Sequence, residues 1–159
     1  MRILFLGTSS FALPALKALA ESGHTLLLAV TQPDRPAGRG LNPQPSAVKR
    51  FALARSIPLF QPEDIHQSDS LDRLRALKPE IAVVASYGVM LRKSLLGLPV
   101  HGCINIHASL LPAWRGAAPV ARALMNGDPK TGVAIFRIVR KLDAGPILGM
   151  RETDIRPEE

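Results

Sequence analysis

The sequence lacks several features that would each define a class of protein. It has one cysteine, Cys103, in 159 residues, which excludes an internal disulfide framework and suits a reducing compartment. Its longest apolar runs, such as residues 81–85, are far shorter than the roughly 20 residues that a membrane-spanning helix needs. The N-terminus shows no signal-peptide cleavage pattern. These absences predict a cytoplasmic protein without a membrane segment.

The glycine fingerprints of nucleotide-binding proteins are also missing. The first turn reads FLGTSSFA and contains neither GxGxxG nor GxxxxGK[ST], which argues against a Rossmann dehydrogenase domain and against a P-loop NTPase. His24, His66 and His101 are scattered, and Cys103 has no partner at the spacing of a zinc site. We therefore expect no bound metal.

What is present is an ordinary globular composition with a basic balance. Apolar residues make up 47% of the chain and charged residues 21%, and the length fits one domain. The formal net charge of +7 favours anionic partners. Nucleic acids, nucleotides and folates are all anionic, and many soluble proteins are basic for no specific reason. The charge therefore does not choose among these partners.

Apolar runs alternate with segments of helical spacing along most of the chain. We expect strands near residues 2–6, 25–30, 58–60, 81–85, 103–107, 133–139 and 146–150, and helices near 11–20, 47–55, 70–77, 92–96 and 118–125. Ser9 or Ser10 is expected to cap the first helix and Gly23 to close it. The alternation predicts an α/β fold, a Rossmann-like open and mostly parallel twisted sheet with helices on both faces.

Residues 32–46 read QPDRPAGRGLNPQPS and are expected to form a long loop. The prolines and glycines of this segment oppose regular structure. The loop carries Arg35 and Arg39, and long loops inside compact domains are more often functional than accidental.

Three polar residues are candidates for chemistry. Asn105 and His107 are two residues apart on an expected strand, so their side chains share a face, at the strand end where open α/β sheets bind ligands. An amide donor beside an imidazole can hold an oxyanion while protons move, although either residue could simply be a satisfied polar group. Asp143 is either a turn aspartate or, if it lies near His107, a carboxylate that favours the imidazolium.

An apolar loop, Ser109-Leu110-Leu111-Pro112, follows the expected strand that carries Asn105 and His107. An apolar wall with accessible backbone groups suits a flat heteroaromatic ligand. The same residues could instead pack beneath the domain, and composition leaves both interpretations open.

Taken together, these motifs resemble the 10-formyltetrahydrofolate-dependent formyltransferases. The similarity rests on INIHASLLPAWRGAAP and LDAGPIL, together with MRILFLGTSSFALPAL, TQPDRPAGRG, PSAVK, PLFQPED and VVASYGVMLRK, and it covers essentially the whole chain. The pattern Asn-x-His-x-Ser-Leu-Leu-Pro…Arg-Gly, with a later Asp-x-Gly, is highly specific for this superfamily. The PDRPAGRG loop is similar to that of the members that formylate methionyl-initiator-tRNA in translation initiation.

The resemblance implies a role for each matched position. Asn105 would hold the formyl carbonyl oxygen as the methionyl amine attacks, and His107 would stabilise the tetrahedral intermediate. Asp143 would tune His107 and help to move the amine proton. The oxyanion would be met by hydrogen-bond donors, so no metal is needed.

The resemblance also implies where the substrates bind. The formyl donor, 10-formyltetrahydrofolate, would lie against two groups of residues: the backbone around Tyr87, Gly88, Val89 and Met90, and the loop of Ser109, Leu110, Leu111 and Pro112. Arg35 and Arg39 would reach the acceptor stem of the initiator tRNA. We expect the protein to act as a monomer.

Two departures from the family pattern accompany the resemblance. Residues 1–159 would be an incomplete formyltransferase catalytic domain, without the C-terminal β-barrel domain that helps to grip tRNA. Arg137, Arg140 and Lys141 make the segment before Asp143 more basic than the family pattern. A formyltransferase for a small amine, such as a ribonucleotide or sugar nucleotide, and a non-catalytic folate-binding module remain as alternatives.

Overall fold

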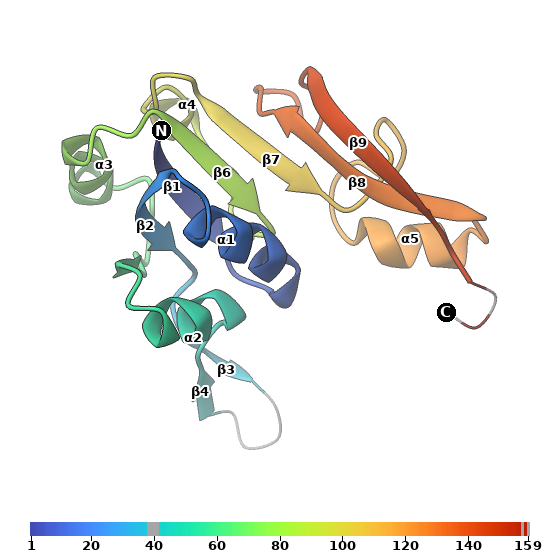
Figure 1. The fold of residues 1–159 in the computed structure, drawn as a ribbon, viewed down its shortest axis with the longest axis horizontal. Coiled ribbons are helices and arrows are strands. Elements are labelled where there is room, and N and C mark those ends of the chain that lie inside the picture. Colours follow the sequence, from blue (N-terminus) through green and yellow to red (C-terminus); the bar gives the residue numbers. More distant parts are fainter. Residues whose placement is uncertain (38–41, 157, 159) are drawn as a thin grey trace. The chain divides into compact units, whose positions relative to one another are not determined.

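The structure is a computed structural model that describes residues 1–37, 42–156 and 158 (Figure 1). Its internal contacts divide the chain into two units, Met1–Cys103 and Ile104–Glu159. None of the helices in the described part of the chain has the length and apolar character needed to cross a membrane.

A parallel sheet forms the centre of the first unit. Its strands are β1 (Arg2–Gly7), β2 (Thr25–Val30), β5 (Leu59–Phe60) and β6 (Ile81–Ala85), in the order β5-β2-β1-β6. The inner strands are continuous apolar runs whose residues are mostly buried, as expected for strands covered on both faces. This order, with the first strand inside and later strands on either side, is that of a doubly wound α/β sheet.

Helices connect these strands as the sequence pattern predicts. The first unit contains η1 (Ser10–Ala12), α1 (Leu13–Ala20), α2 (Ala47–Ala54), α3 (Ser68–Ala76) and α4 (Lys93–Leu96). The N-terminus of α2 is capped by Ser46, whose side chain accepts a hydrogen bond from the Lys49 backbone amide.

The predicted caps of the first helix are wrong at both ends. Ser9 precedes the short η1 and makes no capping hydrogen bond; its hydroxyl donates instead to Ser86 Oγ over 2.7 Å. The 3-10 turn η1 therefore lies between Ser9 and α1, and Ser10 is the first residue of that turn. At the other end Glu21 is the C-cap, and Gly23 lies beyond it without the left-handed backbone of a closing glycine.

The expected loop at residues 32–46 contains a short hairpin, so the prediction that it lacks regular structure is wrong. Strand β3 (Arg35–Ala37) pairs antiparallel with β4 (Asn42–Gln44), and Pro36 lies opposite Pro43. Proline's missing N–H is tolerated because each strand of a two-stranded ribbon has a free edge. Arg39 lies outside the described residues.

Antiparallel pairing characterises the second unit. Strand β7 (Cys103–His107) pairs with β8 (Lys130–Arg137), and β8 pairs with β9 (Ile147–Asp154); α5 (Pro119–Met125) precedes β8. Burial alternates along the middle of β8, with Ala134 and Phe136 packed against Leu111 and Ile138. The expected strands are present, with β8 beginning earlier and β9 ending later than the apolar pattern indicates.

Candidate active site

The last residue of β7 and the turn between β8 and β9 bring His107 and Asp143 together within the second unit. His107 Nδ1 lies 3.8 Å from Asp143 Oδ2, and the two side chains are only 8% and 12% exposed. At this separation the two groups form an ion pair only when His107 is protonated, and the distance is too long for a direct hydrogen bond. The sequence could not show this proximity, because 36 positions of chain separate the two residues.

The imidazole of His107 is held on two further sides. Its Nε2 lies 2.9 Å from the carbonyl oxygen of Trp114. A carbonyl oxygen only accepts hydrogen bonds, so Nε2 carries the proton and Nδ1 faces the carboxylate. The ring also meets Phe136 edge to face, with centroids 6.4 Å apart and an interplanar angle of 81°. The orientation of the ring is therefore set by packing and by hydrogen bonding together.

A tight turn orients the carboxylate of Asp143. The residue has a positive φ of 43°, which aspartate tolerates better than most residues, and its Oδ2 accepts the Gly116 N–H over 2.8 Å. Two residues later, a Cβ on Gly145 would lie 1.7 Å from the carbonyl oxygen of Arg137. Only glycine fits that position, so the close approach of the turn to β8 depends on it.

One loop, residues 108–118, holds both members of the pair. Its Trp114 carbonyl accepts from His107, and its Gly116 amide donates to Asp143. The indole of Trp114 is itself anchored, since Nε1 donates to Asp128 Oδ2 over 2.6 Å. Sequence reasoning missed Gly116 and Asp128. The Trp-Arg-Gly motif indicates the loop, but the sequence does not indicate which side chains the backbone atoms of this motif bind.

Asn105 occupies the same strand as His107, as predicted, and is half-buried opposite Phe136 of β8. Within the described part of the chain, no hydrogen bond is recorded for its side-chain amide. A side-chain amide without an internal hydrogen bond can donate to the carbonyl oxygen of a bound ligand.

The four residues expected to line a ligand site after β7 divide into two kinds. Ser109 is fully buried and donates to the carbonyl oxygen of Ala113 over 2.7 Å, and Leu111 belongs to the core beneath β8. Leu110 is half-buried and Pro112 is exposed. Ser109 and Leu111 therefore shape the loop from inside, while Leu110 and Pro112 are the members open to a ligand.

The other expected ligand segment, Tyr87–Met90, lies in the first unit directly after β6. Tyr87 is 2% exposed, and burial raises the pKa of its phenol to about 12. Its carbonyl oxygen accepts from Thr8 Oγ1 over 2.9 Å, and Gly88 has a φ of +89°. The segment thus keeps the tyrosine ring inside and presents Gly88, Val89 and the exposed Met90.

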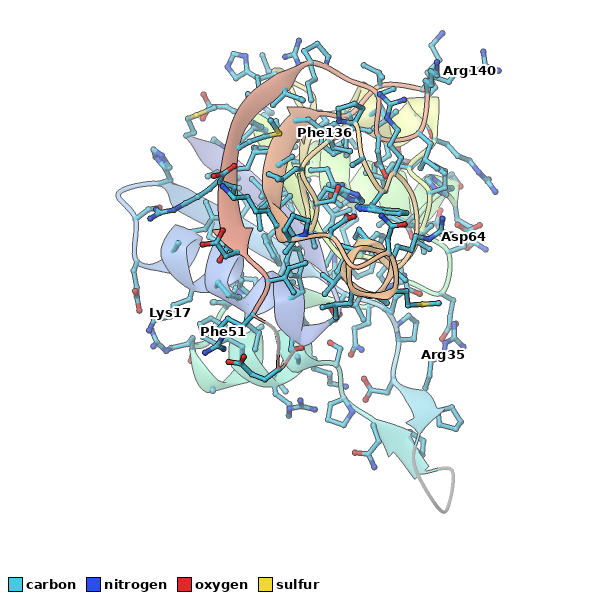
Figure 2. The ribbon with its side chains drawn as sticks, turned by 90° about the vertical axis from the view of Figure 1, so that its right-hand side faces the viewer. Lys17, Arg35, Phe51, Asp64, Phe136 and Arg140 are labelled. Atoms are coloured by element: carbon cyan, nitrogen blue, oxygen red, sulfur yellow. The ribbon has the colours of Figure 1, made fainter. Side chains whose placement is uncertain are left out.

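The hairpin of the first unit carries Arg35 at its base (Figure 2). Arg35 forms an exposed ion pair with Glu63 over 3.2 Å. The preceding Asp34 accepts from Lys49 Nζ over 2.6 Å and from Gln61 Nε2 over 2.8 Å. These hydrogen bonds, that of Lys49 first, lower the pKa of Asp34 below its ordinary value. The chain entering the hairpin is therefore anchored to α2 and to the segment after β5.

The described residues contain no group of three or more histidine, cysteine, aspartate or glutamate side chains placed to hold a metal ion. Cys103 is buried, and burial raises the pKa of its thiol to about 12. A thiol in that state is a packing group rather than a nucleophile.

The fold and this constellation define an α/β protein in which a buried imidazole faces a carboxylate and an amide lies on the same strand as the imidazole. The family described as Formyl transferase matches residues 1–159, and the chain belongs to that family. It is 50% identical over its whole length to the methionyl-tRNA formyltransferase of Methylococcus capsulatus and 48% identical to that of Thermotoga neapolitana. The chain spans about half the length of these relatives, 52% and 51% respectively.

Solved structures share the fold. The phosphoribosylglycinamide formyltransferase of Bacillus halodurans superposes with a TM-score of 0.81 at 22% identity, covering 100% of this chain and 82% of that one. The glycinamide ribonucleotide transformylase 1 of Geobacillus kaustophilus gives 0.78 at 24% identity, with coverages of 99% and 85%. These likenesses concern the fold alone.

Proposed function

We propose that the chain transfers the formyl group of 10-formyltetrahydrofolate to the amino group of methionyl-initiator-tRNA, in translation initiation. Family membership and relatives of about 50% identity named methionyl-tRNA formyltransferase support this substrate pair. The observation that carries the proposal is the His107–Asp143 pair, held by one loop, with His107 on the strand that also presents the amide of Asn105.

The proposed reaction forms one bond and breaks one. The neutral amine attacks the formyl carbon, the bond from that carbon to the folate nitrogen breaks, and the proton lost by the amine ends on the folate nitrogen. Negative charge develops on the formyl oxygen, and the Asn105 amide donates a hydrogen bond to it. His107 and Asp143 supply the acid–base pair that stabilises the intermediate and carries the proton.

Both ring nitrogens of His107 have neighbours in this structure, which limits how the ring takes part. Nε2 donates to the Trp114 carbonyl and Nδ1 faces Asp143. In our proposal Asn105 is therefore the first donor to the oxyanion. His107 joins it by exchanging the Trp114 carbonyl for the substrate oxygen, or acts through its charge.

We propose that the formyl donor binds through Gly88, Val89, Met90 and the backbone of Tyr87, and through Leu110 and Pro112, with Ser109 and Leu111 supporting that loop. The expectation is supported by the accessible surfaces of Leu110, Pro112 and Met90. Flat heteroaromatic ligands are commonly bound by apolar walls with a few backbone hydrogen bonds.

We propose that the β3–β4 hairpin, with Arg35 and Arg39, contacts the acceptor stem of the tRNA. The net charge of +7 and the anchoring of Asp34 support a role in binding a polyanion. A reducing cytoplasm, where initiator tRNA is charged, suits a chain whose single cysteine is a buried thiol. Residues 1–159 would then belong to the catalytic domain of the enzyme.

The test is a formyl-transfer assay with labelled 10-formyltetrahydrofolate and either charged initiator tRNA or glycinamide ribonucleotide as the amine. We expect transfer to the tRNA, and Asn105→Ala should lower its rate roughly 10²- to 10³-fold because it removes one oxyanion donor. Gln67→Ala, which removes an exposed amide before α3, is the matched control.

Three results would contradict the proposal. Transfer only to the ribonucleotide would establish the small-amine alternative. Donor binding without transfer to either amine would favour a non-catalytic folate-binding module. A folded Asn105→Ala chain with wild-type activity would remove Asn105 from the mechanism.

A further inference from the structure

The segment that follows β6, residues 86–90, is held in place by side chains from distant parts of the first unit. Ser9 Oγ donates to Ser86 Oγ over 2.7 Å, and Thr8 Oγ1 donates to the Tyr87 carbonyl over 2.9 Å. At the far end, His66 Nε2 lies 2.9 Å from the carbonyl oxygen of Met90. Hydrogen bonds therefore fix the segment at both ends.

His66 makes its contact across 24 positions of sequence, from the turn that precedes α3. The turn is itself ordered, because the His66 backbone N–H donates to Asp64 Oδ1 over 2.8 Å and Ser70 Oγ donates to the Asp64 carbonyl over 2.9 Å. The labelled Asp64 side chain marks this turn in Figure 2. The imidazole thus projects from a fixed base.

The hydrogen bond to Met90 determines the tautomer of His66. The carbonyl oxygen can only accept, so Nε2 carries the proton. Nδ1 is buried and has no hydrogen-bond partner among the described residues. A buried polar atom without a partner costs free energy. The hydrogen bond to the Met90 carbonyl is the only one that the imidazole ring makes among the described residues.

The segment needs such support because its middle is conformationally permissive. Gly88 has a φ of +89° and nothing within 4 Å of where a Cβ would be, so neighbouring atoms do not restrain it by packing. The Met90 side chain is 66% exposed and adds little anchoring of its own. The hydrogen bond to the Met90 carbonyl restrains the Met90–Leu91 peptide and thereby limits the orientations open to the peptides before it.

We propose that His66 is a positioning residue for the formyl donor: it orients the backbone of residues 88–90, against which the donor's heteroaromatic ring binds. The inference rests on the proposed function, since it assigns His66 to the donor segment proposed above. His66 acts through the Met90 carbonyl and does not touch the donor. Its loss should therefore weaken donor binding and leave the chemical step, which belongs to residues of the second unit, nearly unchanged.

The first measurement is the affinity for tetrahydrofolate, together with kcat and KM for the formyl donor. His66→Leu keeps the apolar volume and removes the hydrogen-bond donor, so Kd and KM should rise about two- to tenfold, as for one lost hydrogen bond, with kcat within about twofold of wild type. His66→Gln restores a side-chain N–H near the position of Nε2 and should return both constants to within about twofold of wild type. The control is His24→Leu, at an exposed histidine beside the N-terminus, which should change neither constant.

A second measurement needs no ligand and no activity. Amide hydrogen exchange of residues 87–91 should be faster in His66→Leu than in wild type and near wild type in His66→Gln, while β1 and β6 stay equally protected in all three. Unchanged exchange and unchanged Kd in a folded His66→Leu chain would overturn the inference. So would an equal loss of protection throughout the first unit, which marks a purely structural residue, or a fall in kcat at constant KM.

The two measurements separate this inference from the proposed function. If wild type binds no tetrahydrofolate, the donor role of His66 fails together with the proposed function. The exchange data would still show whether His66 restrains residues 87–91. If wild type binds and turns over the donor while His66→Leu behaves identically, the positioning role alone fails.

Discussion

The two units differ in which groups hydrogen bonds hold in place near the ends of their strands. In the first unit, side chains hold backbone: Thr8 and His66 bind the carbonyl oxygens of Tyr87 and Met90. In the second unit, backbone holds side chains: the Trp114 carbonyl orients His107, and the Gly116 amide orients Asp143.

This difference matches what each region is proposed to do. A segment that recognises a ligand through its own peptide groups must be held by something else, and side chains from neighbouring strand ends are the available donors. Side chains that move protons must be held without adding further titratable groups, and backbone amides and carbonyls have fixed dipoles and do not titrate near neutral pH. Experiments on each unit test this difference in roles.

The largest expected effect is that of His107→Ala. The variant removes the acid–base group and leaves Asp143 without its partner, so formyl transfer should fall roughly 10²- to 10³-fold in kcat/KM. Donor affinity should change little, because His107 is not among the residues proposed to bind the donor. Steady-state kinetics with charged initiator tRNA and titration with tetrahydrofolate provide the two readouts. His24→Ala is the control, and a folded His107→Ala chain that keeps its activity would break the division of roles.

The next largest effect concerns the turn that carries Asp143. Gly145→Ala would place a Cβ against the Arg137 carbonyl, so the turn must shift, and we expect a loss of about 3 kcal/mol in the free energy of unfolding. Gly149→Ala, in β9 of the same unit, meets nothing within 4 Å and should change stability by less than about 0.5 kcal/mol. Urea titration followed by circular dichroism measures both, and similar values for the two glycines would show that the close approach is unimportant.

The smallest expected effect is in the first unit, at the base of the hairpin. The pKa of Asp34 is lowered in the folded chain from an ordinary value of 3.8, chiefly by the hydrogen bond from Lys49. The carboxylate therefore stabilises the fold above about pH 4, and that contribution is lost as the pH falls through the lowered pKa. Asp34→Asn should melt at a lower temperature than wild type at pH 7, and the difference should be smaller at pH 3, below the ordinary value of 3.8.

Asp72→Asn is the matched control for this comparison, because Asp72 forms an exposed ion pair with Arg75 on α3. Exposed pairs contribute little to stability, so its melting temperature should follow wild type at both pH values. A difference between Asp34→Asn and wild type that persists unchanged at pH 3 would show that the carboxylate charge is not the cause.

Much of the fold was predictable because apolar runs carry their own boundaries. The expected strands at 25–30, 81–85 and 103–107 agree with β2, β6 and β7, since the first two runs are bounded by polar residues and the third begins after Gly102. The hairpin at β3 and β4 was not predicted because its prolines and glycines oppose regular structure locally, whereas the pairing of the two strands is not a local property. The predicted cap at Ser9 was wrong because its hydroxyl is directed to Ser86, 77 positions away, to which it donates a hydrogen bond.

The residues of the candidate site were predictable from the sequence, but the contacts between them were not. Period two along a strand places Asn105 and His107 on one face, and the family motif singles out Asp143. The 3.8 Å approach of the pair, the anchoring of Trp114 by Asp128 and the contact of His66 with Met90 depend on long-range folding. The last of these contacts ends on a backbone carbonyl oxygen, a group that every residue type carries.

Sequence patterns alone were enough to predict most of the helices and strands, the parallel core of the first unit, the family, and the three residues proposed for the chemistry. They were enough because periodicity, apolar runs and motif spacing are local properties of the chain. Three features became known only from the three-dimensional structure: the direction in which the His107 ring faces, the loop that holds this ring, and the inward orientation of Ser109 and Leu111. Leu110 and Pro112 do not turn inward. Those outcomes depend on the hydrogen bonds of His107 and Ser109 to backbone carbonyls and on the packing of Leu111 against β8, whose geometry exists only after folding.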